Sequence, residues 1–235
     1  MIKIIKSHDR HHDDFGWLDT HWHFSFDSYY DPENMNWGAL RVFNDDIIRP
    51  AKGFGMHPHR DMEIVTYVLD GELEHQDNHG NRGVVHSGEI QVMSAGTGIM
   101  HSEYNHSQEN PVHLIQLWIL PRTRGSKPRW EQRGFSRDER RGKLLPVVSS
   151  GNLEGTLAID QDAEIRVAAL DAAEEVVYRS RAGRKIYLFV ISGSITVNGE
   201  TLAAGDQGKI ADETELNIRA DENSELILLD LPSEP

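Results

Sequence analysis

Short apolar runs, each closed by a tight turn, recur along most of the chain. Residues 64–69 are rich in β-branched and aromatic side chains and end at Asp70-Gly71, a dipeptide that favours a hairpin turn. Further strands are predicted at residues 73–76, which precede a turn, and in the runs 90–93 and 114–120. No stretch shows the periodicity of a convincing amphipathic helix. The pattern therefore predicts a protein built almost wholly from β-strands.

The first fifty residues are rich in aromatic side chains and histidine, and their pattern is less regular. Residues 22–26 partly alternate between apolar and polar side chains, and residues 40–43 predict a strand. The polar residues 44–46 are predicted to turn the chain. Four histidines lie within residues 11–23, but their spacings match no compact set of metal ligands, so we expect surface or hydrogen-bonded side chains there.

The second half of the chain repeats the turn signals of the first half. Residues 187–193 correspond to residues 65–71, and residues 226–231 correspond to residues 115–120. The order and the spacing of these features agree once one shorter turn is allowed. Self-similarity of this kind indicates a duplicated β-barrel domain.

The two halves differ in the side chains that could carry chemistry. All 13 histidines lie at or before His113, and the chain has no cysteine. The second barrel is therefore expected to lack metal ligands and to support or shield the first. The pattern predicts a metal-binding N-terminal domain at residues 1–121, a connector at 122–143 and a C-terminal domain at 144–235.

The connector is basic although the chain as a whole is acidic. Residues 122–143 contain nine Lys or Arg and three Asp or Glu, whereas the whole chain carries a formal charge of −14. A basic segment in an acidic protein most often packs on acidic neighbours in the same chain, which is the structure we expect. The alternative is a docking patch for an acidic partner.

Composition excludes several classes of protein. The absence of cysteine excludes disulfides, thiol catalysis and thiolate metal sites, and it is compatible with a reducing cytoplasm. The acidic charge disfavours direct binding to nucleic acid or to anionic membranes. The first ten residues contain no apolar signal region, and no run approaches the length that spans a bilayer. We expect a cytoplasmic protein that is a monomer.

Two short phrases carry the candidate chemistry. His57-Pro58-His59 and His101-Ser102-Glu103 each place two metal-ligand side chains at positions i and i+2. On a β-strand such side chains point to the same face, roughly 6–7 Å apart. If the two strands lie side by side, three imidazoles and one carboxylate converge on one point. The sequence therefore predicts a mononuclear metal site made of His57, His59, His101 and Glu103.

The donor set limits the choice of metal ion. Imidazoles with one carboxylate suit divalent iron, manganese, cobalt, nickel or copper, and a closed structural zinc site is disfavoured without thiolates. We expect one divalent transition metal ion, with Fe(II) as the first candidate and Cu, Ni, Mn, Co and Zn as alternatives. Glu63 is an alternative ligand but is expected to lie behind the ligands or to face solvent. The remaining histidines are expected to be solvated: His75, His79, His86, His106 and His113.

The sequence resembles the pirin family of bicupins, and within it the bacterial members with quercetin 2,3-dioxygenase activity. The most specific segments lie in the first half: residues 16–19, 24–26, 29–32, 40–42, 44–46, 53–59, 62–63, 74–77 and 94–105. One departure is His21-Trp22-His23, where bacterial members usually read Trp-His-Thr. The resemblance implies two consecutive cupin-type (jelly-roll) barrels, with His57, His59, His101 and Glu103 as metal ligands and Glu63 left out.

The resemblance also implies a substrate and a reaction. The substrate would be a flavonol whose 3-hydroxyl approaches the metal, with Glu103 as general base, and dioxygen would open the heterocyclic ring with loss of carbon monoxide. Family relatives with co-regulator roles leave an alternative, a metal-containing regulatory protein with a protein partner. We consider the side chains Phe24, Phe26, Phe43, Tyr67 and Met93 as lining for an apolar pocket or as ordinary barrel packing.

Overall fold

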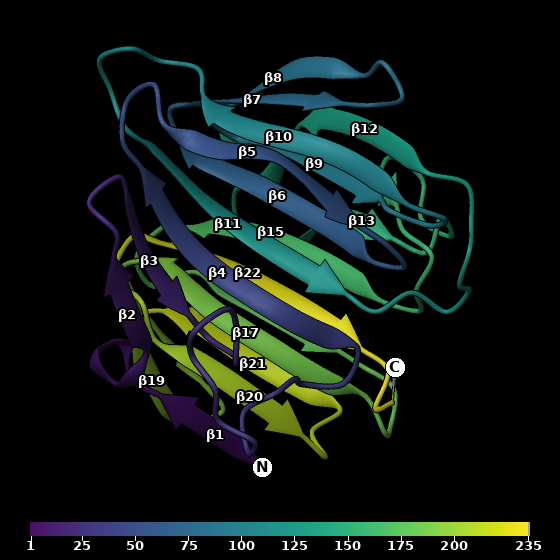
Figure 1. Ribbon diagram of the computed structural model, residues 1–235. Helices are drawn as coiled ribbons and strands as arrows, with labels where there is room; N and C mark the ends of the chain where they lie inside the picture. The colour runs from purple at the N-terminus through teal and green to yellow at the C-terminus, as the bar shows by residue number, and fades with distance from the viewer. Residues whose placement is uncertain (235) are drawn as a thin grey trace.

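The computed structural model describes residues 1–234 and is built almost wholly from β-strands, as the apolar pattern predicts. Two barrels, each made of a seven-stranded and a four-stranded sheet, lie one above the other (Figure 1). The helical elements are short, namely η1 (Ser7–Asp9) and α1 (Arg137–Arg140). The last residue of the predicted C-terminal domain, Pro235, lies outside the described residues.

The N-terminal barrel contains the first group of strands. Its seven-stranded sheet has the order β12 (Arg129–Gly134), β9 (Glu89–Ser94), β6 (Glu63–Asp70), β11 (Val112–Ile119), β4 (Leu40–Ile48), β3 (Leu18–Trp22) and β2 (His11–Asp14). Its four-stranded sheet has the order β5 (Gly53–His59), β10 (Ile99–Asn105), β7 (Glu72–Asp77) and β8 (Arg82–His86).

The C-terminal barrel repeats this arrangement. Its seven-stranded sheet has the order β1 (Ile2–Ile5), β20 (Gln207–Ala211), β17 (Lys185–Ser192), β22 (Ser224–Leu231), β15 (Glu164–Leu170), β13 (Leu145–Ser149) and β14 (Leu157–Ala158). Its four-stranded sheet has the order β16 (Glu175–Arg179), β21 (Glu215–Ala220), β18 (Ser194–Val197) and β19 (Glu200–Ala203). The equivalent strand orders confirm the predicted duplication.

Each barrel takes one edge strand from outside its own stretch of the chain. β1, the first strand, pairs with β20 of the C-terminal barrel, and Figure 1 shows it at the bottom of the molecule. β12, which lies within the predicted connector, pairs with β9 of the N-terminal barrel. The division at residues 121 and 143 stays a prediction, but the strand pairing shows that two strands cross these limits.

The barrels are joined by a shared apolar core. It contains Phe43 and Leu117 from the N-terminal barrel together with Tyr187 and Leu229 from the C-terminal barrel. Because these side chains come from the two seven-stranded sheets, those sheets pack against each other and leave their opposite faces for the barrel interiors. Burial of this apolar area is the main force that holds the two halves together.

The basic side chains of the connector contact acidic neighbours of the same chain. Arg137 and Arg140 both pair with Glu225, and Arg141 pairs with Asp171 at 2.5 Å. These contacts confirm the expected packing on acidic neighbours. Arg140 is buried against the Tyr67 hydroxyl, so this segment contributes to the junction between the barrels.

The interpretation of residues 44–46 as a turn is wrong. β4 continues through these residues to Ile48, and Asn44 and Asp46 are buried on one face of the strand. Asp45 points to the other face and pairs with Arg10 and His113. Three consecutive polar side chains normally indicate a loop, but here Asp45 has charged partners and Asp46 accepts a hydrogen bond from Thr20 within the sheet.

Among residues 1–234 we find no helix that has the length and apolar character a bilayer crossing needs.

Candidate metal centre

The strands that carry the two predicted ligand pairs lie side by side. β5 and β10 pair in antiparallel fashion, with His101 opposite His57 and Ile99 opposite His59. An irregularity in the pairing follows His101, so that Glu103 lies opposite Phe54. The predicted site required these two strands to be neighbours, and the pairing shows that they are.

The three histidines form a compact cluster. Atoms of His57, His59 and His101 that could bind a metal all lie within 4.8 Å of one another. The ring centroids of His57 and His101 are 4.4 Å apart, and those of His57 and His59 are 4.8 Å apart. His57 Nδ1 lies 2.7 Å from the carbonyl oxygen of Gly55, which fixes its proton there and leaves Nε2 with a free lone pair.

His101 gives the most direct indication of a metal ion. The side chain is 1% exposed, and its Nε2 has no hydrogen-bond partner among the described residues. An unpaired buried polar atom is costly, and a bound ion would satisfy it. Burial and neighbouring charges lower the pKa of both His59 and His101 to about 4, so that both rings are neutral at neutral pH. Neutral imidazoles are the form that binds metal, and the residues present fit a divalent transition metal ion.

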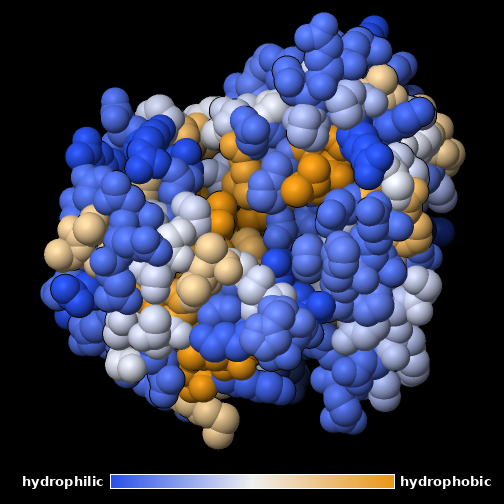
Figure 2. Space-filling view, turned by 90° about the vertical axis from the view of Figure 1, so that its left-hand side faces the viewer, coloured by the Kyte–Doolittle hydropathy of each residue, from blue (hydrophilic) through white to orange (hydrophobic). Residues whose placement is uncertain are grey.

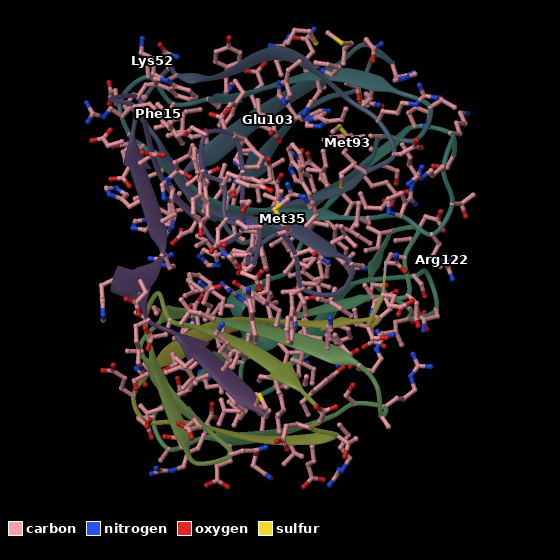
Figure 3. All side chains as sticks on the ribbon, turned by 60° about the horizontal axis from the view of Figure 1, so that its bottom comes forward. Phe15, Met35, Lys52, Met93, Glu103 and Arg122 are labelled. Atoms are coloured by element: carbon pink, nitrogen blue, oxygen red, sulfur yellow. The ribbon has the colours of Figure 1, made fainter. Side chains whose placement is uncertain are left out.

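Glu103 lies inside the N-terminal barrel, as Figure 3 shows, and is 2% exposed. Its two oxygens accept hydrogen bonds from Gln91 Nε2 at 2.6 Å and Gln116 Nε2 at 2.8 Å. Burial opposes ionisation of this carboxyl, but the imidazoles of His101 and His75 and the Gln116 amide outweigh it and lower its pKa. Glu103 is therefore a carboxylate held in one orientation.

Glu103 belongs to a second group that overlaps the first. His75, His101 and Glu103 also have candidate ligand atoms within 4.8 Å of one another. His101 is thus common to both groups, which together contain the four predicted ligands and His75.

His75 was expected to be solvated, and this expectation is wrong. The side chain is fully buried, with Nδ1 3.5 Å from His101 Nδ1 and Nε2 3.4 Å from Asp77 Oδ2. Its ring stacks on Trp130 at 5.1 Å between centroids. Trp130 comes from β12, so only the long-range pairing of this strand shows that His75 is enclosed. The spacing His75-Gln76-Asp77 is the one sequence signal that could have indicated it.

The other histidines and Glu63 lie outside the cluster. His79, His86 and His106 are exposed, as expected, whereas His113 is half-buried and lies 2.6 Å from Asp45. Glu63 is 1% exposed and accepts a hydrogen bond from Ser94 at 2.6 Å. Glu63 therefore does not face solvent, and it belongs to neither group of candidate ligands. Three of the four early histidines have polar side-chain partners: His11 with Asp13, His12 with Asp19, and His23, whose Nδ1 lies 2.7 Å from the Tyr187 hydroxyl.

A cavity of about 310 Å³ opens beside the cluster, and His57, His59 and Glu103 line it. Six aromatic side chains contribute to its wall: Phe15, Trp17, Trp22, Phe26, Phe54 and Trp118. Figure 2 shows hydrophobic side chains around a hollow near the middle of one face, and a further hydrophobic group lower on the same face.

Of the five side chains considered as pocket lining, Phe26 is in the wall. The other four belong to the packed apolar cores: Phe24, Phe43, Tyr67 and Met93. The alternating strand pattern could not separate the two faces here because both faces of the seven-stranded sheet are buried.

The fold and the site define a class of protein, a double β-barrel with a candidate metal centre in one barrel. Residues 5–119 match the family Pirin, and residues 146–231 match the Quercetinase C-terminal cupin domain. The chain belongs to the pirin family of bicupins. Both predicted cupin barrels are thereby confirmed.

Relatives support this assignment over nearly the whole chain. The chain is 48% identical over 233 residues to a protein from Escherichia coli (strain K12) named quercetin 2,3-dioxygenase, with 99% of both chains covered. It is 47% identical to a pirin-like protein from Caulobacter vibrioides, covering 92% of this chain and 94% of that one. The crystal structure of the bacterial pirin YhhW from Escherichia coli in complex with nickel(II) superposes with a TM-score of 0.94 at 46% identity, covering 99% of each chain.

Proposed function

We propose that this protein is a metal-dependent dioxygenase that opens the heterocyclic ring of a flavonol such as quercetin. The observation that carries the proposal is the position of three clustered histidines and one carboxylate beside an aromatic-walled cavity. The relatives named quercetin 2,3-dioxygenase support the reaction class. The reaction would consume one flavonol and one dioxygen molecule and yield a ring-opened ester and carbon monoxide.

The proposed ligands are His57, His59, His101 and Glu103. They would hold one divalent transition metal ion, and a nickel(II) complex of the similar Escherichia coli protein supports a divalent ion in general. Fe(II) is our first candidate for the native metal. When bound, the ion would polarise the flavonol oxygens as a Lewis acid and bring dioxygen within reach of the substrate.

The protein residues would prepare the substrate for this chemistry. The aromatic walls, such as Trp22 and Trp118, would stack on the flat rings and exclude water. Glu103 is the proposed general base for the 3-hydroxyl, and the proton would go to one of its carboxylate oxygens. Gln91 and Gln116 would keep that carboxylate aimed at the substrate.

The alternative, a regulatory protein with a partner at the basic connector, gains no support from the structure. The arginines of that segment that would form the docking patch include Arg137, Arg140 and Arg141, which pair with acidic residues of the same chain. The expectations of a monomer, of a cytoplasmic location and of no nucleic-acid binding stay predictions.

The test is to follow the visible absorbance of quercetin with metal-loaded protein in air and under argon. Bleaching that requires oxygen, with release of carbon monoxide, is the expected result, and Glu103→Ala should abolish it. Metal analysis of protein purified without chelator identifies the native ion. Absence of turnover with iron, copper, nickel, manganese and cobalt would refute the proposal.

A further inference from the structure

A row of polar side chains crosses the inner face of the seven-stranded sheet in the N-terminal barrel. Asn44 on β4 lies opposite Gln116 on β11, which lies opposite Thr66 on β6, and Thr66 lies opposite Gln91 on β9. Gln116 and Gln91 hold Glu103. Asn44 extends this row by one strand towards β3. Neighbouring strands are about 5 Å apart, so Asn44 lies next to Gln116.

Asn44 has an unsatisfied hydrogen-bond acceptor. The side chain is 4% exposed and lines the cavity, yet its Oδ1 has no partner among the described residues. Leaving a buried carbonyl oxygen unpaired costs about 1–3 kcal/mol, and native structures rarely keep such a group without a reason. A hydrogen-bond donor for this oxygen would have to come from the cavity that Asn44 lines.

Asp46 lies two residues further along β4, on the same face, and also lines the cavity. It is 3% exposed, and the Thr20 hydroxyl donates a hydrogen bond to its Oδ1. Burial, with added repulsion from Asp45 and Glu103, raises the pKa of Asp46 to about 7. Near neutral pH this group can both donate and accept a hydrogen bond, as a phenolic hydroxyl does.

The rest of the cavity wall selects the kind of molecule that could bring such a hydroxyl. Trp22 and Phe26 stand with their rings at 67° and 5.5 Å apart, and Phe26 meets Trp118 at 85° and 5.3 Å. Aromatic walls of this type favour a flat, apolar ring system. Asn44 and Asp46, with the neighbouring Gln116, are therefore polar groups set among these aromatic rings.

We propose that Asn44 and Asp46 form a hydroxyl-recognition subsite that binds a phenolic hydroxyl of a flat aromatic ligand, separate from the group that approaches the metal. This assignment rests on the proposed function, in which the flavonol 3-hydroxyl is directed to the metal side. Asn44 and Asp46 would then determine specificity, because they would favour polyhydroxylated flavonols over those that carry the 3-hydroxyl alone.

The experiment compares two probes under argon, so that binding is measured without turnover. Quercetin carries hydroxyls on both outer ring systems, whereas 3-hydroxyflavone has only the 3-hydroxyl. Metal-loaded wild type should bind quercetin more tightly, as followed by isothermal titration calorimetry. Asn44→Leu, which keeps the size and removes the acceptor, should reduce the ratio of the two affinities about five- to tenfold, the effect of one hydrogen bond. Asp46→Asn should reduce it less, because an amide still hydrogen-bonds.

The matched control is Asp45→Asn, a carboxylate on the same strand that points to the opposite face. It should leave the ratio of affinities at the wild-type value. Thermal melting and metal content identify any variant that fails to fold, and Asn44→Ala replaces Asn44→Leu if the latter does so.

The proposal is overturned if wild type does not prefer quercetin, if it binds neither probe, or if Asn44→Leu weakens both probes equally. Admission of air to the same samples tests the proposed function separately. A preference for quercetin that depends on Asn44, without any consumption of oxygen, would retain the subsite and refute the dioxygenase.

Discussion

The two barrels share one topology and differ in what fills them. In the N-terminal barrel Glu103 lies opposite His75, and in the C-terminal barrel the corresponding pair is Ile218 opposite Val197. Leu216 stands two residues before Ile218, where the first barrel has His101. All three apolar side chains are fully buried.

The same replacement extends across the seven-stranded sheets. Thr66 lies opposite Gln116 in the first barrel, and Leu188 lies opposite Leu228 at the corresponding place in the second. The second interior is accordingly one continuous apolar core, whereas apolar side chains in the first form two separate clusters. The fold thus needs only an apolar layer, and the polar interior of the first barrel is an addition that chemistry requires.

The difference also indicates that the two barrels contribute differently to the stability of the protein. Buried polar groups stabilise only when they are satisfied, so an interior that keeps unpaired atoms at His101 and Asn44 is not optimised for stability. The C-terminal barrel has an apolar interior and packs its seven-stranded sheet against that of its neighbour. We infer that it supports the sheet from which Asn44 and Gln116 project.

The largest effect on metal binding is expected when His101 of the first barrel is replaced by leucine, the residue at the corresponding position of the second barrel, Leu216. His101→Leu should abolish stoichiometric metal binding, because the proposed ligand is lost, and should not destabilise the metal-free protein, because an unpaired buried nitrogen is removed. Metal analysis and thermal melting check both effects.

The opposite behaviour is expected at the corresponding position of the C-terminal barrel. Leu216→Ala should lower the free energy of unfolding by about 2–5 kcal/mol through the cavity it leaves, while metal binding persists. Equal metal loss in the two variants would show that the comparison between the barrels is wrong.

A smaller effect is expected behind the ligands, at His75. His75→Val introduces the residue of the second barrel and removes the group that contacts His101 Nδ1 at 3.5 Å. Loss of such a partner should weaken metal affinity about 10–100-fold without removing a proposed ligand. Isothermal titration with Co(II), together with the Co(II) visible spectrum, measures the change. His79→Ala, at an exposed histidine nearby in sequence, is the control and should bind as wild type does.

Asp46 should make stability depend on pH in a direction unusual for a carboxyl. Its pKa is raised to about 7 from an ordinary 3.8. Between these values the folded state holds a proton that the unfolded state has released, so the free energy of unfolding falls as the pH rises through this window. Chemical denaturation at pH 5 and pH 8 should show a smaller fall in the free energy of unfolding for Asp46→Asn than for wild type. The same fall in both proteins would mean that Asp46 is ionised throughout this range.

The smallest effect on stability is expected at an ion pair on the surface of the connector, outside both barrel interiors. Arg141 pairs with Asp171 while both side chains are largely exposed. Arg141→Ala should therefore change the free energy of unfolding very little and leave metal binding unaltered. A large loss of stability would show that the ion pair between Arg141 and Asp171 is more than a surface contact.

The sequence by itself determined the β architecture, the duplication and the difference between the halves, because these depend on local alternation and on which residues are present. His57-Pro58-His59 and His101-Ser102-Glu103 were informative because the two-residue period of a strand is a local property. No local rule relates one strand to a distant one. The strand through Asn44 and Asp46, the enclosure of His75 by Trp130 and the edge strand β1 on the second barrel therefore appeared only in the structure.

The cavity likewise depends on how distant strands pair in the tertiary structure. Trp118 lies far along the chain from Phe15 and Trp22, and their convergence depends on the register of β3, β4 and β11. Register is decided by the burial of all strands together, since a slip of one residue would exchange the faces of a whole strand. The chain therefore shows which side chains can act, and the tertiary structure decides which of them meet.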